Sequence, residues 1–385
     1  MRPVSVVGIG QVPVRKEHER SLRQLGAEVL CQALADAGLD DVEALYLGNM
    51  LSDELQGQKH LAALVADEAR LQGVEALQLR AATASGAAAL RAGYLAVAGG
   101  ALDRVVVAGV EKMSAAVPTS VLAKALDAER EVPDGATLLS QNAHLMQLYL
   151  ERFRPPAGAL AAFAVNAHRN ACRNPNAMFC TRELTVADVL SSRVINAPLR
   201  LFDCAPISDG AAAVVLVPRA EARRYTDNPV HLLASAVATD RFRLEDRPNP
   251  LHLQAAQRSA AKALAQARLN RDDVSFFEVH DAFTIMSCLL LEATGFAVPG
   301  EGWRLAAEGE ISLSGSIPIT TMGGLKARGH PVGATALYQA CEIVLQLTGR
   351  AGPNQLPDAQ VALMQSVGGV AATVITHIFT AGDVL

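Results

Sequence analysis

The 385-residue sequence is poor in aromatic side chains, and it lacks the features that mark several classes of protein. It has no block of basic residues and a net charge of −5, which argues against a surface that binds nucleic acid by neutralising phosphates. No apolar run is long enough to span a bilayer, and the N-terminus lacks the charged-then-apolar plan of a signal peptide. We therefore expect a cytoplasmic protein that binds neither nucleic acid nor membrane.

Cysteine is scarce too, and its spacing excludes two further classes. The six cysteines are scattered along the chain, and no two of them form a Cys-x-x-Cys pair. This pattern argues against a zinc site or a disulfide framework and fits a reducing compartment. We predict no metal site.

Half of the residues are apolar, with many alanines and valines, and they are arranged in alternating patterns. Apolar runs at 4–10, 42–49 and 104–109 are typical of buried strands, and the spacing at 22–37 and 60–71 is helical. Alternation of this kind predicts an α/β fold, with a parallel or mixed sheet that is covered on both faces.

Two motifs occur twice in the same order, which indicates an internal duplication of βαβ units. The recurring segments are 33–39 with 263–269, and Gly86-x-x-Ala89-Leu90 with Gly333-x-x-Ala336-Leu337. The register that aligns them places Thr83 opposite His330. Duplicated halves would bring these two loops together at strand ends, where α/β proteins bind their ligands.

The duplication suggests a division of the chain into three parts. Residues 1–115 with 200–225 form an N-terminal half, and 226–385 form a C-terminal half. Between them, 116–199 contain several prolines among helical pieces and break the rhythm of strands and helices. We interpret this segment as an excursion over the functional site, where substrate-binding loops commonly lie.

His330 lies in the segment with the most unusual composition. Residues 323–335 contain four glycines and a proline, so we expect a tight loop without helix or strand, followed directly by a helix. A rigid turn at the start of a helix holds one imidazole and presents backbone N–H groups to an anion or a polarised carbonyl.

The chain resembles the thiolases, in the branch that includes the archaeal and sterol-carrier-protein types, over almost its whole length. The motifs that carry the resemblance are Gly109-Val110-Glu111-Lys112-Met113, Asp203-Cys204-x-Pro206-x-Ser208-Asp209-Gly210-Ala211, Val279-His280-Asp281-Ala282-Phe283-Thr284, 323–335 with its Gly-His-Pro triplet, and Gln365-Ser366-Val367-Gly368-Gly369. The resemblance implies a thiolase fold with duplicated βαβ halves in five α-β-α-β-α layers. It also implies a homodimer or tetramer that acts on acyl-CoA, with coenzyme A as part of the substrate and no permanently bound cofactor.

The resemblance also implies roles for individual residues. The implied catalytic residues are His330, His280 and Thr83, with backbone N–H groups of Gly368 and Gly369 at the oxyanion and with Met113, His144 and Arg328 near the substrate. Thr83 departs from the pattern, because thiolases have their nucleophilic cysteine at this position, at the start of a helix where the dipole favours a thiolate. Ser366 stands where many thiolases have a second cysteine, and Ala282 stands where the sterol-carrier type has one.

Several functions remain open from the sequence. One is acyl transfer that forms or breaks the carbon–carbon bond next to a CoA thioester, with Thr83 as a weak nucleophile. Another dispenses with a covalent intermediate: His330 and His280 stabilise an enolate for decarboxylation, retro-aldol or retro-Claisen cleavage. A third is a degenerate thiolase that binds acyl-CoA or acts as a scaffold. An engineered replacement of cysteine by threonine is a further possibility.

Thiolases of this branch resemble subunits that pair with a small acyl-CoA-binding protein made of an OB-fold and a zinc ribbon. The resemblance therefore implies such a partner as an alternative to self-association alone.

Overall fold

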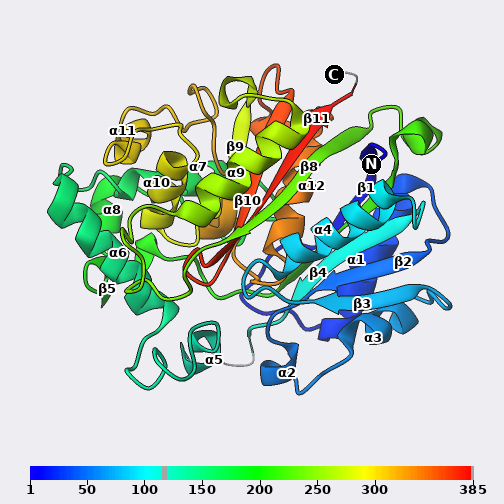
Figure 1. Cartoon of the computed structure of the whole chain (residues 1–385), viewed down its shortest axis with the longest axis horizontal. Helices are drawn as coiled ribbons and strands as arrows, with labels where there is room; N and C mark the ends of the chain where they lie inside the picture. The colour runs from blue at the N-terminus through cyan, green and yellow to red at the C-terminus, as the bar shows by residue number, and fades with distance from the viewer. Residues whose placement is uncertain (115–118, 383–385) are drawn as a thin grey trace.

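A computed structural model of the chain describes residues 1–114 and 119–382. Within these residues, nine strands form one mixed sheet in the order β3-β2-β4-β7-β1-β8-β11-β10-β9 (Figure 1). The strands are β1 (Val4–Gln11), β2 (Ala44–Gly48), β3 (Glu75–Leu79), β4 (Val105–Glu111), β7 (Gly210–Pro218), β8 (Val230–Thr239), β9 (Phe276–Glu278), β10 (Val361–Gly368) and β11 (Thr373–Ala381), with β5 (Val194–Asn196) and β6 (Leu199–Arg200) in a separate hairpin.

The predicted duplication is confirmed by the strand order. In the first half, β2 is parallel to both β3 and β4, and β7 is antiparallel to β4 and β1. The second half repeats this plan, because β9 is parallel to β10, and β11 is antiparallel to β10 and β8. A single parallel bridge between Phe277 and Ile319 takes the place of β3 in the second half. Strands β1 and β8 join the halves through antiparallel pairs such as Val4 with Leu232.

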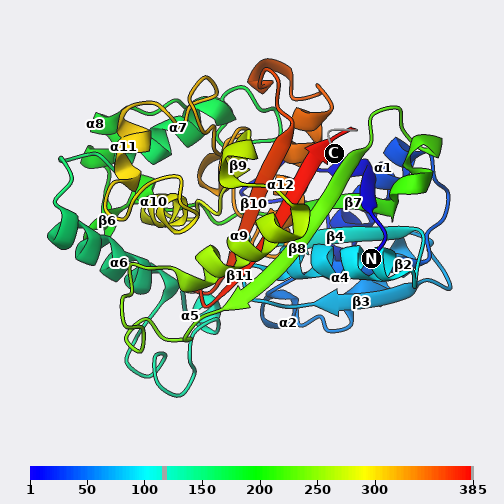
Figure 2. The same cartoon turned by 45° about the horizontal axis from the view of Figure 1, so that its top comes forward.

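The helices complete the five layers, as the two views of the chain show (Figures 1 and 2). Helices α1 and α3 cover the outer face of the first half, α4 and α12 lie between the halves, and α9 and α10 cover the outer face of the second half. The helices are α1 (Leu22–Ala37), α2 (Ser52–Leu55), α3 (Leu61–Glu68), α4 (Ser85–Gly99), α5 (Thr119–Ala123), α6 (Leu138–Phe153), α7 (Ala161–Ala171), α8 (Val186–Ser191), α9 (Gln254–Ala267), α10 (Thr284–Ala293), α11 (Gly302–Ala307) and α12 (Thr335–Leu347).

The ends of α1 show how the sequence sets an element. Ser21 Oγ accepts a hydrogen bond from the N–H of Gln24, and Gln24 Oε1 accepts one from the N–H of Ser21. This capping box satisfies donors that the first turn leaves free. Gly38 ends the helix in a left-handed conformation that suits glycine. The helix predicted over 22–37 is confirmed.

The glycine-rich segment before α12 differs from the prediction in one respect. We expected a loop without helix, but Gly324–Arg328 form one π-helical turn. The turn is held by Asp281, whose carboxylate accepts hydrogen bonds from the N–H groups of Leu325, at 2.7 Å, and Lys326, at 3.2 Å. A carboxylate from a distant part of the sequence thus stabilises a helical turn that the local composition does not predict.

The excursion between the halves packs against the second half. Helix α6 contacts α10, and α7 contacts the π-helical turn. The first residues of the predicted excursion, 116–118, lie outside the described residues, as does residue 115. Residues of α6, which lies beside α10, line the cavity described below. The excursion therefore supplies one wall of that cavity.

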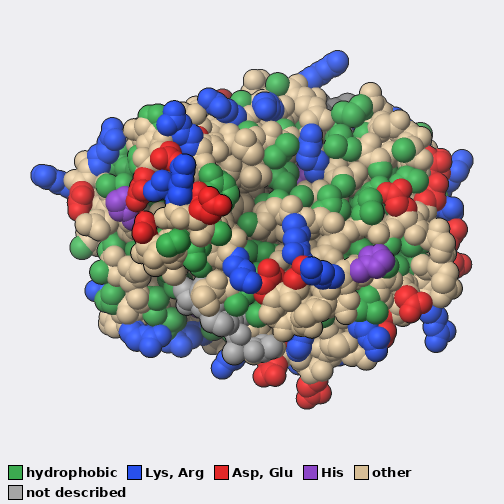
Figure 3. Space-filling view, turned by 60° about the horizontal axis from the view of Figure 1, so that its bottom comes forward, with side chains coloured by type: hydrophobic (Ala, Val, Ile, Leu, Met, Phe, Trp, Pro, Cys, Tyr) green, Lys and Arg blue, Asp and Glu red, His purple; other side chains and the backbone are tan. Residues whose placement is uncertain are grey.

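The surface agrees with the charge balance of the sequence. Lysine and arginine side chains are interspersed with aspartate and glutamate on the face seen in Figure 3, without a continuous basic stripe there. In the part of the chain that the structure describes, no helix combines the length and the apolar composition that crossing a bilayer requires.

Candidate functional site

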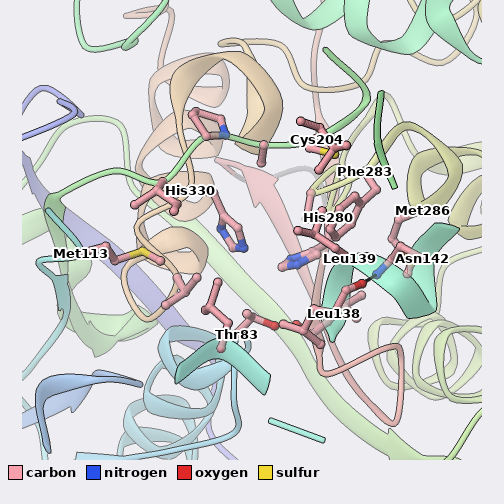
Figure 4. A pocket seen from close by; sticks show the side chains of 18 of the residues that line it. Thr83, Met113, Leu138, Leu139, Asn142, Cys204, His280, Phe283, Met286 and His330 are labelled. Atoms are coloured by element: carbon pink, nitrogen blue, oxygen red, sulfur yellow. Dashed lines mark hydrogen bonds between the residues drawn. The ribbon is translucent and has the colours of Figure 1, made fainter. Parts of the chain in front are cut away.

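A cavity of about 460 Å³ lies where the two halves and the excursion meet (Figure 4). Its lining is apolar for the most part and includes the ends of both pseudo-equivalent loops. The lining residues are Lys16, Thr83, Met113, Leu122, Leu138, Leu139, Asn142, Met178, Ile195, Leu201, Cys204, Ala205, Pro206, Ile207, His280, Ala282, Phe283, Met286, His330, Val332, Val367 and Gly369. The structure therefore brings Thr83, His280, His330, Met113 and Gly369 together, as the sequence predicted from separate motifs.

The two histidines face each other across the cavity. His280 follows β9, and His330 precedes α12, so each lies at the end of an element in the C-terminal half. Their ring centroids are 5.3 Å apart and the ring planes are nearly perpendicular. Figure 4 shows both rings pointing into the centre of the cavity, with Thr83 below them. At this spacing the rings are in edge-to-face contact, so a substrate atom that both can reach lies beside the pair.

Both imidazoles are neutral at neutral pH. Burial, with the charge of Arg328 as the smaller cause, lowers the pKa of His280 to about 3. Burial also holds the pKa of His330 well below its ordinary value, aided by His280 and Arg328. A neutral imidazole has one N–H donor and one lone pair, so the pair offers both a hydrogen-bond donor and a base.

Hydrogen bonds fix the position of His330. Its backbone N–H donates to Ser208 Oγ at 2.9 Å, and its ring Nδ1 lies 2.7 Å from Thr335 Oγ1. The hydroxyl of Thr335 donates in turn to the carbonyl of Pro331 at 3.3 Å. Gly329 allows this arrangement because its φ is +116° and because a Cβ there would lie 2.5 Å from Val14 Cγ1.

Two buried carboxylates tie the loops of the site to one another. Asp281, next to His280, holds the π-helical turn that leads to His330. Glu111, at the end of β4, accepts hydrogen bonds from the N–H groups of Gly333, at 3.0 Å, and Met50, at 2.8 Å. Burial raises the pKa of Asp281 to about 6 and that of Glu111 to about 7. Backbone N–H groups donate to both carboxylates, and the side-chain amide of Asn49 also donates to Glu111, which indicates a role in holding loops.

Thr83 lies two residues before α4, and its hydroxyl bonds to the end of β10. The side chain is 5% exposed, and its Oγ1 donates to the carbonyl of Val367, at the end of β10, at 2.5 Å. Ser85 supports the same turn, because its Oγ accepts from the N–H of Ala81 at 3.0 Å. The hydroxyl proton of Thr83 is therefore engaged by a carbonyl, and neither imidazole is its partner.

Gly368 and Gly369 pack the end of β10 against the Thr83 loop. A Cβ at Gly368 would lie 2.6 Å from the carbonyl oxygen of Ala81, so only glycine fits this contact. Gly369 borders the cavity with a φ of +65°. Their part in binding an oxyanion stays a prediction.

Two of the residues expected near the substrate lie elsewhere. His144 is on the exposed face of α6. Arg328 is fully buried: its Nε lies 3.0 Å from Glu342 Oε1, and its guanidinium lies 4.8 Å from the centre of the Tyr338 ring. Neither side chain borders the cavity. The sequence does not distinguish these two residues from the residues that line the cavity. Whether a side chain faces the cavity depends on how the helices and loops are oriented in the fold, and residue spacing along the chain does not give that orientation.

The cavity also contains a cysteine that was not assigned to the site. Cys204 borders the cavity, but burial raises the pKa of its thiol to about 12, so it is not a thiolate at neutral pH. All six cysteines are free. Within the described ranges, no group of three or more His, Cys, Asp and Glu side chains is arranged to hold a metal ion.

Several other lining residues come from the excursion and could not be assigned from sequence. Leu138, Leu139 and Asn142 lie on α6, opposite Phe283 and Met286 at the start of α10. Their only signal in the sequence is an ordinary helical pattern, which does not distinguish a cavity wall from a core.

Comparison with known proteins identifies relatives over the whole length. The family model described as "Thiolase, N-terminal domain" matches residues 4–220, and "Thiolase C-terminal domain-like" matches 236–381. An acetyl-CoA acetyltransferase of Methanothermobacter thermautotrophicus is 41% identical over 99% of this chain and 100% of its own length. Sterol carrier protein 2 of Bos taurus is 29% identical over 97% of this chain and 71% of its own length.

Solved structures share the fold at lower identity. One described as an "Ltp2-ChsH2(DUF35) aldolase" superposes with a TM-score of 0.86 at 24% identity, covering 99% of this chain and 98% of the other. An acetyl-CoA acetyltransferase of Syntrophomonas wolfei superposes with a TM-score of 0.76 at 17% identity, covering 99% of both chains.

Proposed function

The chain belongs to the thiolase family, and we propose on this premise that it is an enzyme that makes or breaks the carbon–carbon bond next to the thioester of an acyl-CoA without forming an acyl-enzyme. The observation that carries the proposal is the pairing of two neutral imidazoles across an apolar cavity with a threonine whose hydroxyl donates to Val367. The histidines that handle an enolate are present, and the thiol that carries an acyl group is absent.

Thr83 is a poor nucleophile for physical reasons. A threonine hydroxyl is far harder to deprotonate than a cysteine thiol, and it needs an adjacent base to attack a thioester. The Oγ1 of Thr83 donates to a carbonyl, which is no base, and the β-branched side chain is almost fully buried. Catalysis without a covalent intermediate does not require Thr83 to act as a nucleophile.

The hydrogen bonds around the histidines suggest a role for each ring. We assign the hydroxyl hydrogen of Thr335 to the carbonyl of Pro331; with this assignment Nδ1 of His330 donates to Thr335, and Nε2 keeps a lone pair. Nδ1 of His280 is buried and has no hydrogen-bond partner among the described residues. A lone pair is cheaper to leave unpaired than an N–H group, which favours the hydrogen on Nε2. We assign His330 as the base and His280 as the donor to the oxyanion.

The reaction that fits these roles is aldol cleavage of a β-hydroxyacyl-CoA. His330 takes the hydroxyl proton, the Cα–Cβ bond breaks, and its electron pair moves onto the thioester oxygen. The Nε2–H of His280 donates to this enolate oxygen. Return of the proton to Cα yields a shorter acyl-CoA and an aldehyde or ketone. Atoms and electrons balance without a further reactant, and the reverse direction is a condensation.

A second candidate is acyl transfer to free coenzyme A, and its support is the 41% identity to a protein named acetyl-CoA acetyltransferase. The thiol of coenzyme A would attack the β-carbonyl of a β-ketoacyl-CoA directly, and the same enolate would leave. The two candidates share the enolate but differ in the substrate and in the need for free thiol.

Lys16 is the residue best placed to meet the anionic part of coenzyme A. It is exposed and borders the cavity, so its ammonium group lies at an entrance. The fold neighbour described as an Ltp2–ChsH2(DUF35) aldolase is a reason to test for a second, small protein as well. We propose that such an acyl-CoA-binding partner accompanies a homodimer of this chain.

The test is product analysis with two substrates of equal chain length. The full chain is incubated with 3-hydroxyhexanoyl-CoA alone, and with 3-oxohexanoyl-CoA plus coenzyme A. We expect butanal and acetyl-CoA from the first, with no change in the intact mass of the protein. Cleavage of the 3-oxo substrate alone would favour the second candidate, and a mass gain on Thr83 would overturn the non-covalent route. If His330→Ala behaves like the wild type in both assays, the chain is not an enzyme of this kind.

A further inference from the structure

Lys326 is a buried charge in the segment that leads to His330, and the proposed reaction does not use it. It lies in the π-helical turn, four residues before His330, and it is 3% exposed. It is not among the residues that line the cavity. A buried ammonium group is costly unless other groups take the place of its water. The groups that do so here come from the excursion and from the turn that directly follows it.

An aromatic cage surrounds the ammonium group of Lys326. The Nζ atom lies 3.2 Å from Nε2 of His168, on α7, and 5.7 Å from the ring centres of both Phe179 and Phe202. The three rings also contact one another, because His168 stacks on Phe179 at 5.1 Å and meets Phe202 edge-on at 6.1 Å between centroids. Ring faces attract a cation, so His168, Phe179 and Phe202, which we call the cage, form a binding site for the ammonium group.

The hydrogen bonds of His168 fit a positively charged Lys326. Nδ1 of His168 lies 2.9 Å from the carbonyl oxygen of Arg182, which can only accept, so Nδ1 carries the hydrogen. Burial is the main cause that lowers the pKa of His168 to about 4, so the ring is neutral at neutral pH and Nε2 keeps a lone pair. An ammonium group has donors and no acceptor, so Nζ of Lys326 donates to this lone pair.

The cage connects the turn before His330 to the wall of the cavity. Lys326 belongs to that turn through its own backbone. Met178 and Leu201 line the cavity, and each is next in sequence to a residue of the cage. The side chain of Lys326 thus reaches from the segment that holds one catalytic residue to the segments that surround the substrate.

Backbone hydrogen bonds cross the same boundary. The N–H of Met178 donates to the carbonyl of Arg328 at 2.9 Å. The N–H of Phe179 donates to the carbonyl of Ala327 at 3.2 Å. These two bonds lie next to Lys326 in the sequence, so they report on whether its side chain holds the two segments together.

From these contacts we propose that Lys326 is a positioning residue, whose ammonium group binds in the cage and thereby aligns His330 with the wall of the cavity. The proposal rests on the proposed function, because it takes His330 as the base. The wall holds the substrate and the turn holds the base, so their relative position decides how well the hydroxyl proton is transferred. A misplacement of about 1 Å can lower a rate by about 100-fold.

The charge of Lys326 should change within the pH range of an ordinary assay. Burial is the main cause that lowers its pKa to about 8, so the ammonium form predominates below pH 8 and the neutral amine above it. A ring face attracts the neutral amine less, so kcat should fall as the pH rises through 8. The titratable and charged groups that face the ammonium group are His168, Arg182, Asp203, Cys204 and Asp281. Burial raises the pKa of Cys204 to about 12 and that of Asp281 to about 6, so neither titrates near pH 8.

Steady-state kinetics of the full chain with 3-hydroxyhexanoyl-CoA, on both sides of pH 8, test this role. Lys326→Met keeps the length of the side chain and suits aromatic neighbours, so it should fold. Its kcat should lie about 10-fold to 100-fold below that of the wild type, with KM within about twofold, and should not fall further above pH 8. Lys326→Arg keeps its charge at every pH of the assay, so it should restore part of kcat and hold it above pH 8.

A change in the cage and a distant lysine complete the set of variants. Phe179→Leu removes one ring face, so the ammonium form loses an attraction and the fall in kcat should move to lower pH. Lys262→Met is the matched control, because Lys262 is exposed on α9 and does not border the cavity. Thermal unfolding of each variant confirms that it is folded.

Hydrogen exchange tests the contact without turnover. In Lys326→Met, the N–H groups of Met178 and Phe179 should exchange at least about tenfold faster than in the wild type, because their bonds cross the boundary that Lys326 holds. Exchange of the same groups should be unchanged in Lys262→Met.

The outcomes separate this inference from the function on which it rests. Unchanged exchange at Met178 and Phe179 in Lys326→Met overturns the role of Lys326. A fall in kcat at the same pH in this variant and in the wild type also overturns it, because another group then causes the fall, such as Glu342, whose pKa is raised by burial. If exchange changes as expected but the wild type cleaves neither the 3-hydroxy nor the 3-oxo substrate, the proposed function fails and the contact stands.

Discussion

The hydroxyl of Thr83 donates to the carbonyl of Val367 at 2.5 Å, so the residue at the predicted nucleophile position is hydrogen-bonded to the end of β10. The two residues are 284 positions apart and belong to different halves of the duplicated fold. This contact makes Thr83 a link between the halves, and it removes the hydroxyl proton from the reach of either histidine.

Replacing Thr83 by cysteine should create a covalent route. A thiol at the start of α4 is more acidic and more nucleophilic than the hydroxyl, and the helix dipole favours its thiolate. We expect Thr83→Cys to gain an acetyl group from acetyl-CoA and to raise thiolysis of acetoacetyl-CoA by at least about tenfold. Intact mass and release of free thiol measure these effects. Thr83→Ser is the control, and an acylated serine variant would contradict the role given to the hydroxyl.

The assignment of His330 as base predicts a specific effect at Thr335. His330→Ala should lower kcat by about 100-fold to 10,000-fold, the usual contribution of a positioned base. Thr335→Val removes the acceptor for Nδ1–H but keeps the size of the side chain, so kcat should fall while KM changes little. Steady-state kinetics on the substrate that proves active give both numbers. A rise of KM by the same factor as the fall of kcat in Thr335→Val would point to a general loss of structure.

The buried histidines make stability depend on pH. The pKa of His280 is lowered to about 3, below its ordinary value of 6.5, so the unfolded chain binds its proton first as the pH falls. Its contribution to stability is complete above pH 6.5 and is lost progressively as the pH falls toward 3. Between pH 6.5 and pH 5 the loss is about 2 kcal/mol.

His280→Gln should therefore flatten this part of the pH dependence. Urea unfolding of the wild type and of the variant at pH 7 and pH 5 measures the difference. A variant that loses as much stability as the wild type over this range would show that other groups cause the loss.

Arg328 should matter for stability more than for substrate binding. The guanidinium is fully buried beside Glu342 and the Tyr338 ring. Arg328→Met leaves a buried carboxyl without its partner and should cost about 3–5 kcal/mol. The double variant Arg328→Met, Glu342→Gln should recover part of this loss. Denaturant titration measures both, and additive losses in the double variant would contradict a direct pairing.

Lys16 should affect the binding of coenzyme A esters through charge. Lys16→Glu reverses the charge at the entrance, and we expect the dissociation constant for acyl-CoA to rise by about tenfold at low salt. The effect should shrink as ionic strength increases, because the group is exposed. Lys59→Glu is the matched control, since Lys59 is also exposed but does not border the cavity. A salt-independent effect would point to a different cause.

The sequence was sufficient for the strands predicted at 4–10, 42–49 and 104–109, for the duplication and for the meeting of Thr83 with the histidines. Buried strands and capped helices such as α1 depend on local sequence patterns. The repeated segments place their loops at corresponding ends of the strands in the two halves. The π-helical turn was missed because it depends on Asp281, 44 positions away from Leu325. The cavity wall on α6 and the burial of Arg328 were missed for the same physical reason: each depends on packing between distant segments.

The contact between the repeats has a consequence for how the chain could be divided. A Cβ at Gly86 would lie 2.7 Å from the carbonyl oxygen of Gly333, its counterpart in the second half. Helices α4 and α12 thus meet at matching glycines, and their side chains share one core cluster with strands of both halves. Two fragments obtained by cutting the chain between β7 and β8 would each expose half of this interior. They should therefore reassemble with each other rather than persist as independent proteins.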